Sequence, residues 1–174
     1  MEIDPRIRLP FHDPEEAEQS YVGAAEPSGD AQLRHLQRVP LFSGFNEDEL
    51  RRVAEHSRIL EAPAGTVITQ IGDAGDSFFI IIDGTAGVRT PVGAGGQLQP
   101  GDCFGEMSLV DGEPRSATIV AATDLRLLVV ERSHFWRLLD ETPELMRRIL
   151  TILSRRVRRL EQTIRAILQG PNPA

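Results

Sequence analysis

Two charged residues lie close together in an otherwise apolar segment, FGEMSLVDGEPRSATIVA at residues 104–121. Glu106 follows a glycine, and Arg115 lies nine residues further on. Burying a single charge without a partner is costly, and burying two needs a strong reason. The pattern therefore indicates a ligand that could pair with both side chains.

The residue types define the chemistry of such a ligand. Gly105 would let backbone approach a ligand closely, and the turn through Met107 and Ser108 would offer unpaired N–H groups to an anion. Arg115 carries a planar fork that suits two phosphate oxygens. Glu106 can only accept hydrogen bonds, which suits a hydroxyl such as one on a ribose. Together these groups describe a site for a ribose phosphate.

From about residue 58 to residue 131 the sequence consists of short β-rich runs separated by turn residues. The runs are GTVITQ, SFFIII, AGVRT, ATIVAAT and LRLLVVE, with GDAGD, GAGG and DGEP among the turns between them. Strands that recur every ~8–12 residues predict an antiparallel sandwich or roll and not βαβ units. The expected fold class is α+β, mainly β, with the strands in an antiparallel sandwich or roll.

Two helices are expected before the β-rich region. AQLRHLQRV at 31–39 predicts a short helix that ends at Pro40. The segment FNEDELRRVAEHSR predicts a second helix, because Asn46 and Glu49 have the spacing of a capping box.

Two more helices are expected after the β-rich region. Ser133 is predicted to cap SHFWRLLD, and Thr142 to cap a longer helix with Pro143 at its first position. Apolar residues then recur every three or four positions, at Leu145, Ile149, Leu153, Val157, Leu160, Ile164 and Ile167. From Leu153 onward the spacing is that of heptad a and d positions, which predicts a homodimer through this helix.

The segment FGEMSLVDGEPRSAT resembles the phosphate-binding cassette of cyclic-nucleotide-binding domains, the family of the cAMP receptor protein and of protein kinase regulatory subunits. That cassette usually has F-G-E-hydrophobic-small-L followed by P-R-small-A-T. The resemblance extends over roughly residues 31–168, which we expect to form the domain. It implies an antiparallel, jelly-roll-like β-roll flanked by N-terminal helices and a long C-terminal helix. Residues 1–30 are then expected to be a flexible acidic arm and residues 169–174 a C-terminal tail.

The resemblance implies roles for individual residues. Arg115 would grip the cyclic phosphate and Glu106 the ribose 2′-hydroxyl, while the cradle would be completed around Gly105, Met107, Ser108 and Ser116. A hydroxyl at Ser116 fits either cAMP or cGMP. The best-known bacterial relatives read adenine with a Thr-Ser pair on the C-terminal helix, where this chain has Leu160 and Glu161. The choice of base therefore stays open, and Val157 and Leu160 are candidates for a lid.

Composition narrows the classes of function. The net charge is −7, of which residues 1–30 carry −6, typical of a flexible arm. No apolar run approaches the ~20 residues that span a bilayer, and the first residues lack the features of a signal peptide. With Cys103 as the single cysteine, a buried small side chain in a cytoplasmic protein is expected. We find no nucleophile–base set and no metal-ligand spacing, so neither an enzyme nor a metal or cofactor is predicted.

Two alternatives to a stand-alone cyclic-nucleotide sensor remain open. In the first, the fold is a degenerate interaction module, and Glu106 and Arg115 merely pair with each other. In the second, the protein is a transcription regulator that acts through its Arg-rich helix, since 143–168 holds seven Arg against two Glu. A solvated helix face explains those arginines more simply. Only six residues follow Leu168, where the family's transcription factors place a helix-turn-helix, so DNA is not an expected partner. The downstream partner cannot be identified from the sequence.

Overall fold

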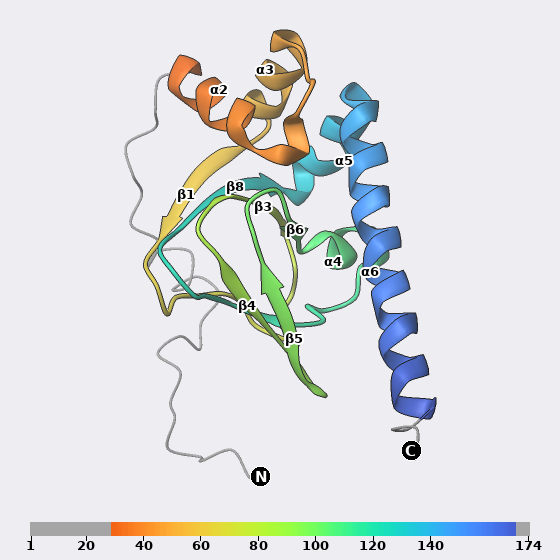
Figure 1. The fold of residues 1–174 in the computed structure, drawn as a ribbon. Helices are drawn as coiled ribbons and strands as arrows, with labels where there is room; N and C mark the ends of the chain where they lie inside the picture. Colours follow the sequence, from red (N-terminus) through yellow and green to blue (C-terminus); the bar gives the residue numbers. More distant parts are fainter. Residues whose placement is uncertain (1–28, 170–174) are drawn as a thin grey trace.

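A computed structural model describes residues 29–169, which form two four-stranded antiparallel sheets with helices around them (Figure 1). One sheet has the order β1-β8-β3-β6 and the other β2-β7-β4-β5. The strands are β1 (Arg58–Ala62), β2 (Val67–Thr69), β3 (Ser77–Asp83), β4 (Ala86–Thr90), β5 (Gly93–Leu98), β6 (Cys103–Phe104), β7 (Thr118–Ala121) and β8 (Leu125–Glu131). The predicted β-roll with a long C-terminal helix is confirmed. The expected arm and tail lie largely outside the described residues.

The central strands β3 and β8 are apolar on both faces because each face meets a different layer. Successive side chains of a strand point to opposite faces. Phe78 and Ile80 accordingly lie in the core shared with the helices, whereas Phe79 and Ile81 lie in the core between the two sheets. This double burial explains why SFFIII and LRLLVVE show no polar alternation.

The helices are α2 (Gly29–Arg38), the 3₁₀ helix η1 (Pro40–Phe42), α3 (Glu47–Glu55), α4 (Glu106–Asp111), α5 (Arg132–Glu141) and α6 (Pro143–Gln169). The predicted capping box at the start of α3 is confirmed: Asn46 Oδ1 accepts from the Glu49 N–H, and the Glu49 carboxylate accepts from the Asn46 N–H.

The predicted cap of α5 is wrong, whereas α6 begins at Pro143 as predicted, with Thr142 at the N-cap position but without a hydrogen bond from its side chain. α5 begins at Arg132, so Ser133 lies inside the helix and its N-cap is Glu131. The Thr142 hydroxyl is buried and has no hydrogen-bond partner among the described residues. The Thr142 carbonyl accepts instead from the Leu145 N–H at 3.0 Å. Tertiary packing thus holds both helix starts without side-chain caps.

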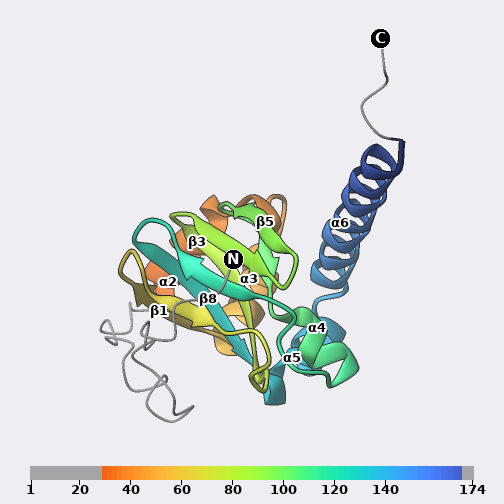
Figure 2. The same cartoon turned by 90° about the horizontal axis from the view of Figure 1, so that it is seen from below.

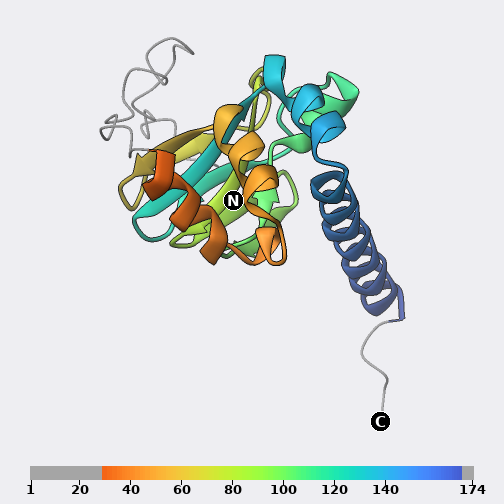
Figure 3. The ribbon, with the colours of Figure 1, turned by 90° about the horizontal axis from the view of Figure 1, so that it is seen from above.

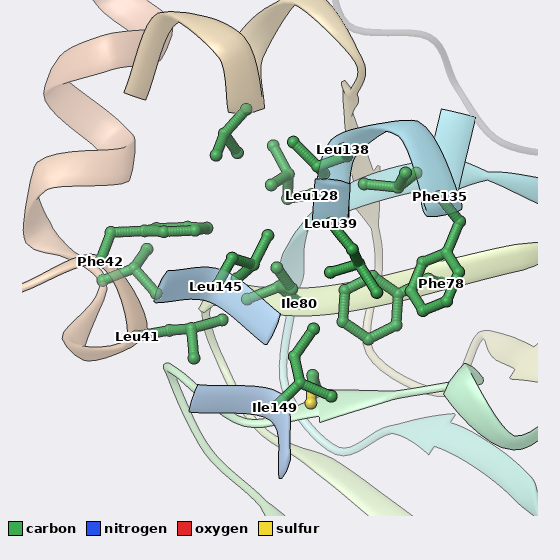
Figure 4. Close-up of a cluster of buried hydrophobic side chains, with 14 of the residues drawn as sticks. Leu41, Phe42, Phe78, Ile80, Leu128, Phe135, Leu138, Leu139, Leu145 and Ile149 are labelled. Atoms are coloured by element: carbon green, nitrogen blue, oxygen red, sulfur yellow. The ribbon is translucent and has the colours of Figure 1, made fainter. Parts of the chain in front are cut away.

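The larger core lies between the β1-β8-β3-β6 sheet and the helices (Figure 4). Leu128 and Ile80, which are paired across β8 and β3, meet Leu138 of α5 and Leu145 of α6 there. All four side chains are fully buried. The first turns of α6 are therefore part of the core that carries the sheet.

The rest of α6 is mostly outside this core. Leu145 and Ile149 are buried, and Arg148 fixes the helix to η1 by donating to the Leu41 carbonyl at 2.6 Å. Figures 2 and 3 show that the helix then projects away from the sheets. Within residues 29–169, no helix is both long enough and apolar enough to cross a membrane.

Replacing Leu128 by Ala should lower the free energy of unfolding by about 2–5 kcal/mol, because the truncation leaves a cavity in a fully buried layer. Urea unfolding followed by circular dichroism measures this loss. Val92 is 98% exposed, so Val92→Ala is the control and should change the free energy by less than about 0.5 kcal/mol. Equal losses in the two variants would contradict the assigned core.

Candidate functional site

The turn from β6 into α4 requires glycine. Gly105 is the N-cap of α4 and has a φ of 84°, in the left-handed region that side chains rarely adopt. A Cβ there would lie 2.6 Å from the Arg115 Nη1 atom and 2.7 Å from the Ser77 carbonyl oxygen. Gly105 therefore allows the backbone to pass directly against the Arg115 guanidinium.

Arg115 is buried beneath this turn and is only 8% exposed. Its Nη1 donates to the Gly105 carbonyl at 2.9 Å, and its Nη2 donates to the Ser77 carbonyl at 2.8 Å. The guanidinium also lies 5.7 Å from the centre of the Phe79 ring. Neutral groups from β3 and the β6–α4 turn thus fix the orientation of the guanidinium.

No carboxylate among residues 29–169 forms an ion pair with Arg115. Burial lowers the pKa of its guanidinium, and the negative fields of Asp76 and Glu106 partly oppose that effect. A buried charge held only by carbonyl dipoles gains strongly from an anion. Two carbonyls also use only part of the donor capacity of a guanidinium, which leaves donors for such an anion.

Glu106, the first residue of α4, is 3% exposed and has a different cation as its partner. Arg156 of α6 donates from Nη1 to Glu106 Oε1 at 3.1 Å, and its Nη2 donates to the Cys103 carbonyl. Glu106 and Arg115 therefore do not simply neutralise each other. The carboxylate is bonded to the long helix, while the guanidinium is held by the roll.

Sequence reasoning missed Arg156 because the residue stands in the run SRRVRR, which was assigned to a solvated face. Arg155, Arg158 and Arg159 are indeed exposed, but Arg156 is half-buried. A signal was available: Ile149, Leu153 and Arg156 follow one another at steps of four and three residues, which places them on one face of the helix. It therefore continues the face of α6 that meets the roll.

The remaining predicted cassette residues surround the same point. Ser108 is 2% exposed and packs closely on Gly75, where a Cβ would lie 2.4 Å from the Ser108 Cβ. Met107 is 50% exposed, and the exposed Ser116 donates from its hydroxyl to the Met107 sulfur at 3.5 Å. The structure brings together all six predicted cassette residues. Gly75, a further contact, comes from the distant β2–β3 loop.

The two candidate lid residues lie elsewhere. Val157 is 55% exposed and Leu160 is 63% exposed, both on the projecting part of α6. Their role as a lid stays a prediction. Cys103 is fully buried as expected, and burial raises the pKa of its thiol to about 12, so the thiolate that oxidants attack is scarce near neutral pH.

The Glu106–Arg156 pair should show strong energetic coupling in a double-mutant cycle. Glu106→Gln and Arg156→Gln should each destabilise the fold, but the double variant should lose at least about 1 kcal/mol less than the sum. The reason is that each single change leaves the other charge without its partner, buried in the case of Glu106 and half-buried in the case of Arg156. Denaturant unfolding of the four proteins gives this coupling energy.

The surface pair Glu47–Arg51, whose side chains are 64% and 57% exposed, is the control cycle. Its coupling should stay near the ~0.3–0.5 kcal/mol of an exposed helix pair. Coupling at Glu106–Arg156 no larger than this control would mean that α6 is not bonded to the cassette in solution.

Comparison with known proteins agrees with this geometry. Residues 59–142 match the family described as "Cyclic nucleotide-binding domain". The chain is 41% identical over 107 residues to a cyclic nucleotide-gated potassium channel of Mesorhizobium japonicum, covering 62% of this chain and 30% of the channel. It is 38% identical over 118 residues to a cAMP-dependent protein kinase regulatory subunit of Aspergillus niger, covering 65% of this chain and 28% of that protein.

The fold is similar to the crystal structure of Thermus thermophilus Catabolite Activator Protein, with a TM-score of 0.64 and 31% identity over 72% of this chain and 61% of that one. The Catabolite Activator Protein thus shares the fold of this chain. The chain spans less than a third of the length of the two sequence relatives, the potassium channel and the kinase regulatory subunit. Residues 59–142 of the chain belong to the cyclic nucleotide-binding domain family.

Proposed function

We propose that the protein is a non-catalytic sensor that binds cAMP or cGMP in the cassette at residues 104–116 and signals through α6. The observation that carries this proposal is the state of Arg115: buried, oriented by two carbonyls, and without a carboxylate partner in the described chain. A cyclic phosphate supplies the missing negative charge and two oxygens for the fork.

Glu106 supports the assignment of a ribose to the same ligand. Arg156 occupies its Oε1 atom, and the described residues place no hydrogen bond on the other oxygen. A carboxylate oxygen in this position can accept from a ribose 2′-hydroxyl. The Arg156 charge also offsets that of the carboxylate, so an anionic ligand does not meet an uncompensated negative group.

The hydroxyl of Ser116 is compatible with both adenine and guanine as the base of the ligand. Its present acceptor is the Met107 thioether, which is a weak one. Replacing that hydrogen bond by one to a phosphate or to a purine edge therefore costs little free energy. One of the two sequence relatives carries cAMP in its name, whereas the name of the other specifies only a cyclic nucleotide.

The bond between Glu106 and Arg156 provides a route for the signal. A ligand that engages Glu106 acts on a group to which α6 is already bonded. The ligand then favours whichever position of α6 keeps both contacts, which is a shift of population between helix positions.

The projecting part of α6 is proposed to pair with a second copy of the chain. Its apolar residues repeat at heptad spacing and are all more than half exposed, at Val157, Leu160, Ile164 and Ile167. A surface hollow on the same helix, lined by Leu150, Leu153, Ser154, Val157, Arg158 and Glu161, can receive an apolar side chain. Knob-into-hole pairing of two such helices buries the stripe and leaves the exposed arginines in water.

Removing the Arg115 side chain should abolish tight binding. In Arg115→Ala, the affinity for cAMP or cGMP should fall by on the order of a hundredfold or more, because two charge-assisted hydrogen bonds are lost. Isothermal titration calorimetry of the purified chain measures the loss. Arg34→Ala, an exposed position on α2, removes the same charge outside the cassette and should bind like the wild type.

A Glu106→Gln variant tests the ribose in the same titrations. It should weaken binding of the natural nucleotide and hardly affect a 2′-deoxy analogue, which lacks the hydroxyl. An Arg115→Ala protein with wild-type affinity would overturn the cassette assignment. A wild-type chain that binds neither cAMP nor cGMP would favour the interaction module without nucleotide.

The dimer is tested by placing charges on the proposed seam. Val157→Asp with Ile164→Asp should give a monomer, because neither charge can be buried between helices without a partner. Gln162→Asp lies on the exposed opposite face and should remain a dimer. Light scattering coupled to size exclusion reports the mass of each. A monomeric wild type at micromolar concentration would contradict the seam.

A further inference from the structure

Arg132 joins three segments around the cassette and has no role in the function proposed above. It is the first residue of α5. Its Nη2 donates to the Gly75 carbonyl at 2.8 Å and to the Ser108 carbonyl at 2.9 Å. Its Nε donates to Asp76 Oδ1 at 3.1 Å. One side chain of α5 therefore contacts both the β2–β3 loop and the cassette helix α4.

These acceptors lie directly beside the proposed phosphate site. Gly75 is the glycine whose Cβ, if present, would lie 2.9 Å from the Arg115 Cζ atom and would clash with Ser108. Gly75 thus touches the Arg115 guanidinium and bonds to the Arg132 guanidinium. A change in how Arg115 or α4 is held will therefore act on the acceptors of Arg132.

The side chain and the backbone of Arg132 make separate connections. The Arg132 N–H donates to the Asp76 carbonyl at 2.7 Å, which holds the start of α5 to the loop whatever the side chain is. Only the guanidinium reaches α4, through the Ser108 carbonyl. A substitution at this position therefore removes the polar link from α4 to α5 and keeps the helix start in place.

The position of α5 connects the Arg132 side chain to the C-terminal helix α6. α5 runs from β8 directly to α6, and its Phe135 ring packs on Phe78 of β3 at 5.2 Å between ring centres. Figure 1 shows α5 beside the first turns of α6, whereas α4 lies beside the middle of that helix. A movement of α5 is therefore passed to the start of α6.

We propose that Arg132 is a positioning residue that couples occupation of the cassette to α5, and through α5 to α6. This inference rests on the proposed nucleotide-binding function. The effect of ligand binding then reaches α6 through the Arg132 side chain, which bridges Ser108, Gly75 and Asp76. A direct contact of the ligand with the projecting part of α6 is not needed. A planar fork can hold several acceptors at fixed angles, whereas an ammonium on a flexible stem cannot.

The chain contains its own reporter for this link. Trp136 is the single tryptophan of the sequence, lies one helical turn beyond Arg132 on α5, and is 48% exposed. Its fluorescence is sensitive to the local surroundings of α5. Titration with cAMP and cGMP, followed both by calorimetry and by Trp136 fluorescence, therefore separates binding from transmission.

The test compares Arg132→Gln, Arg132→Lys and, as the matched control, Arg137→Gln. Arg137 is on the same helix, is 68% exposed and pairs with Glu141 away from the cassette. Arg132→Gln should bind nucleotide about tenfold more weakly and, at saturation, lose at least about half of the wild-type fluorescence change. Arg132→Lys should regain most of the affinity, because the charge is kept, but not the response. Arg137→Gln should keep both.

The outcomes separate this inference from the proposed function. Absence of binding to the wild type overturns both. Binding to the wild type without any change at Trp136, or in hydrogen exchange of α5 amides, overturns the coupling alone. So does a full response in Arg132→Gln at saturation, or an equal loss in Arg137→Gln. Circular dichroism spectra matching the wild type establish that the variants are folded.

Discussion

The buried charge of Arg115 is the constraint around which the rest of the site is built. A guanidinium this far from water needs oriented dipoles, and the Gly105 and Ser77 carbonyls supply them. Each acceptor in turn depends on a larger element: Ser77 begins the central strand β3, and Gly105 joins β6 to α4. The left-handed turn at Gly105 follows from the same need, since a side chain there would occupy the space of the guanidinium.

The second buried charge connects this site to the C-terminal helix. An ion pair between Glu106 and Arg115 would have neutralised both charges and left neither for a ligand. Its partner is Arg156, fifty residues further along the chain. The two charges of the cassette are thus satisfied differently, one by neutral carbonyls and one by a cation on α6. The Arg115 charge therefore remains available to an anion, and Glu106 is placed to contact both a ligand and α6.

α6 has two parts with different physical roles. Its first turns are a core element, with Leu145 fully buried and Arg148 bonded to η1. Beyond the Arg156 contact, the apolar stripe continues without cover from the described chain, and Ile167 is 73% exposed. A helix that is anchored at one end and apolar at the other can pass on small changes near its anchor. Arg132 and Arg156 are the polar contacts that join the cassette to the helices at that end.

The sequence by itself determined the features that depend on short spacing. Strand spacing predicted an antiparallel sandwich or roll, and the family resemblance specified the β-roll. Asn46 and Glu49 predicted the cap of α3, and the cassette pattern brought Gly105, Glu106 and Arg115 into one site. Only the tertiary structure decided which groups satisfy the two charges and where α5 begins. Ser77, Gly75, Arg132 and Arg156 reach the site from segments far apart in the chain. The helical spacing of Arg156 places it on the face of α6 that meets the roll, but local patterns do not identify the partners in such contacts. The partners depend on how the sheets and helices pack and on which buried polar groups then lack hydrogen bonds.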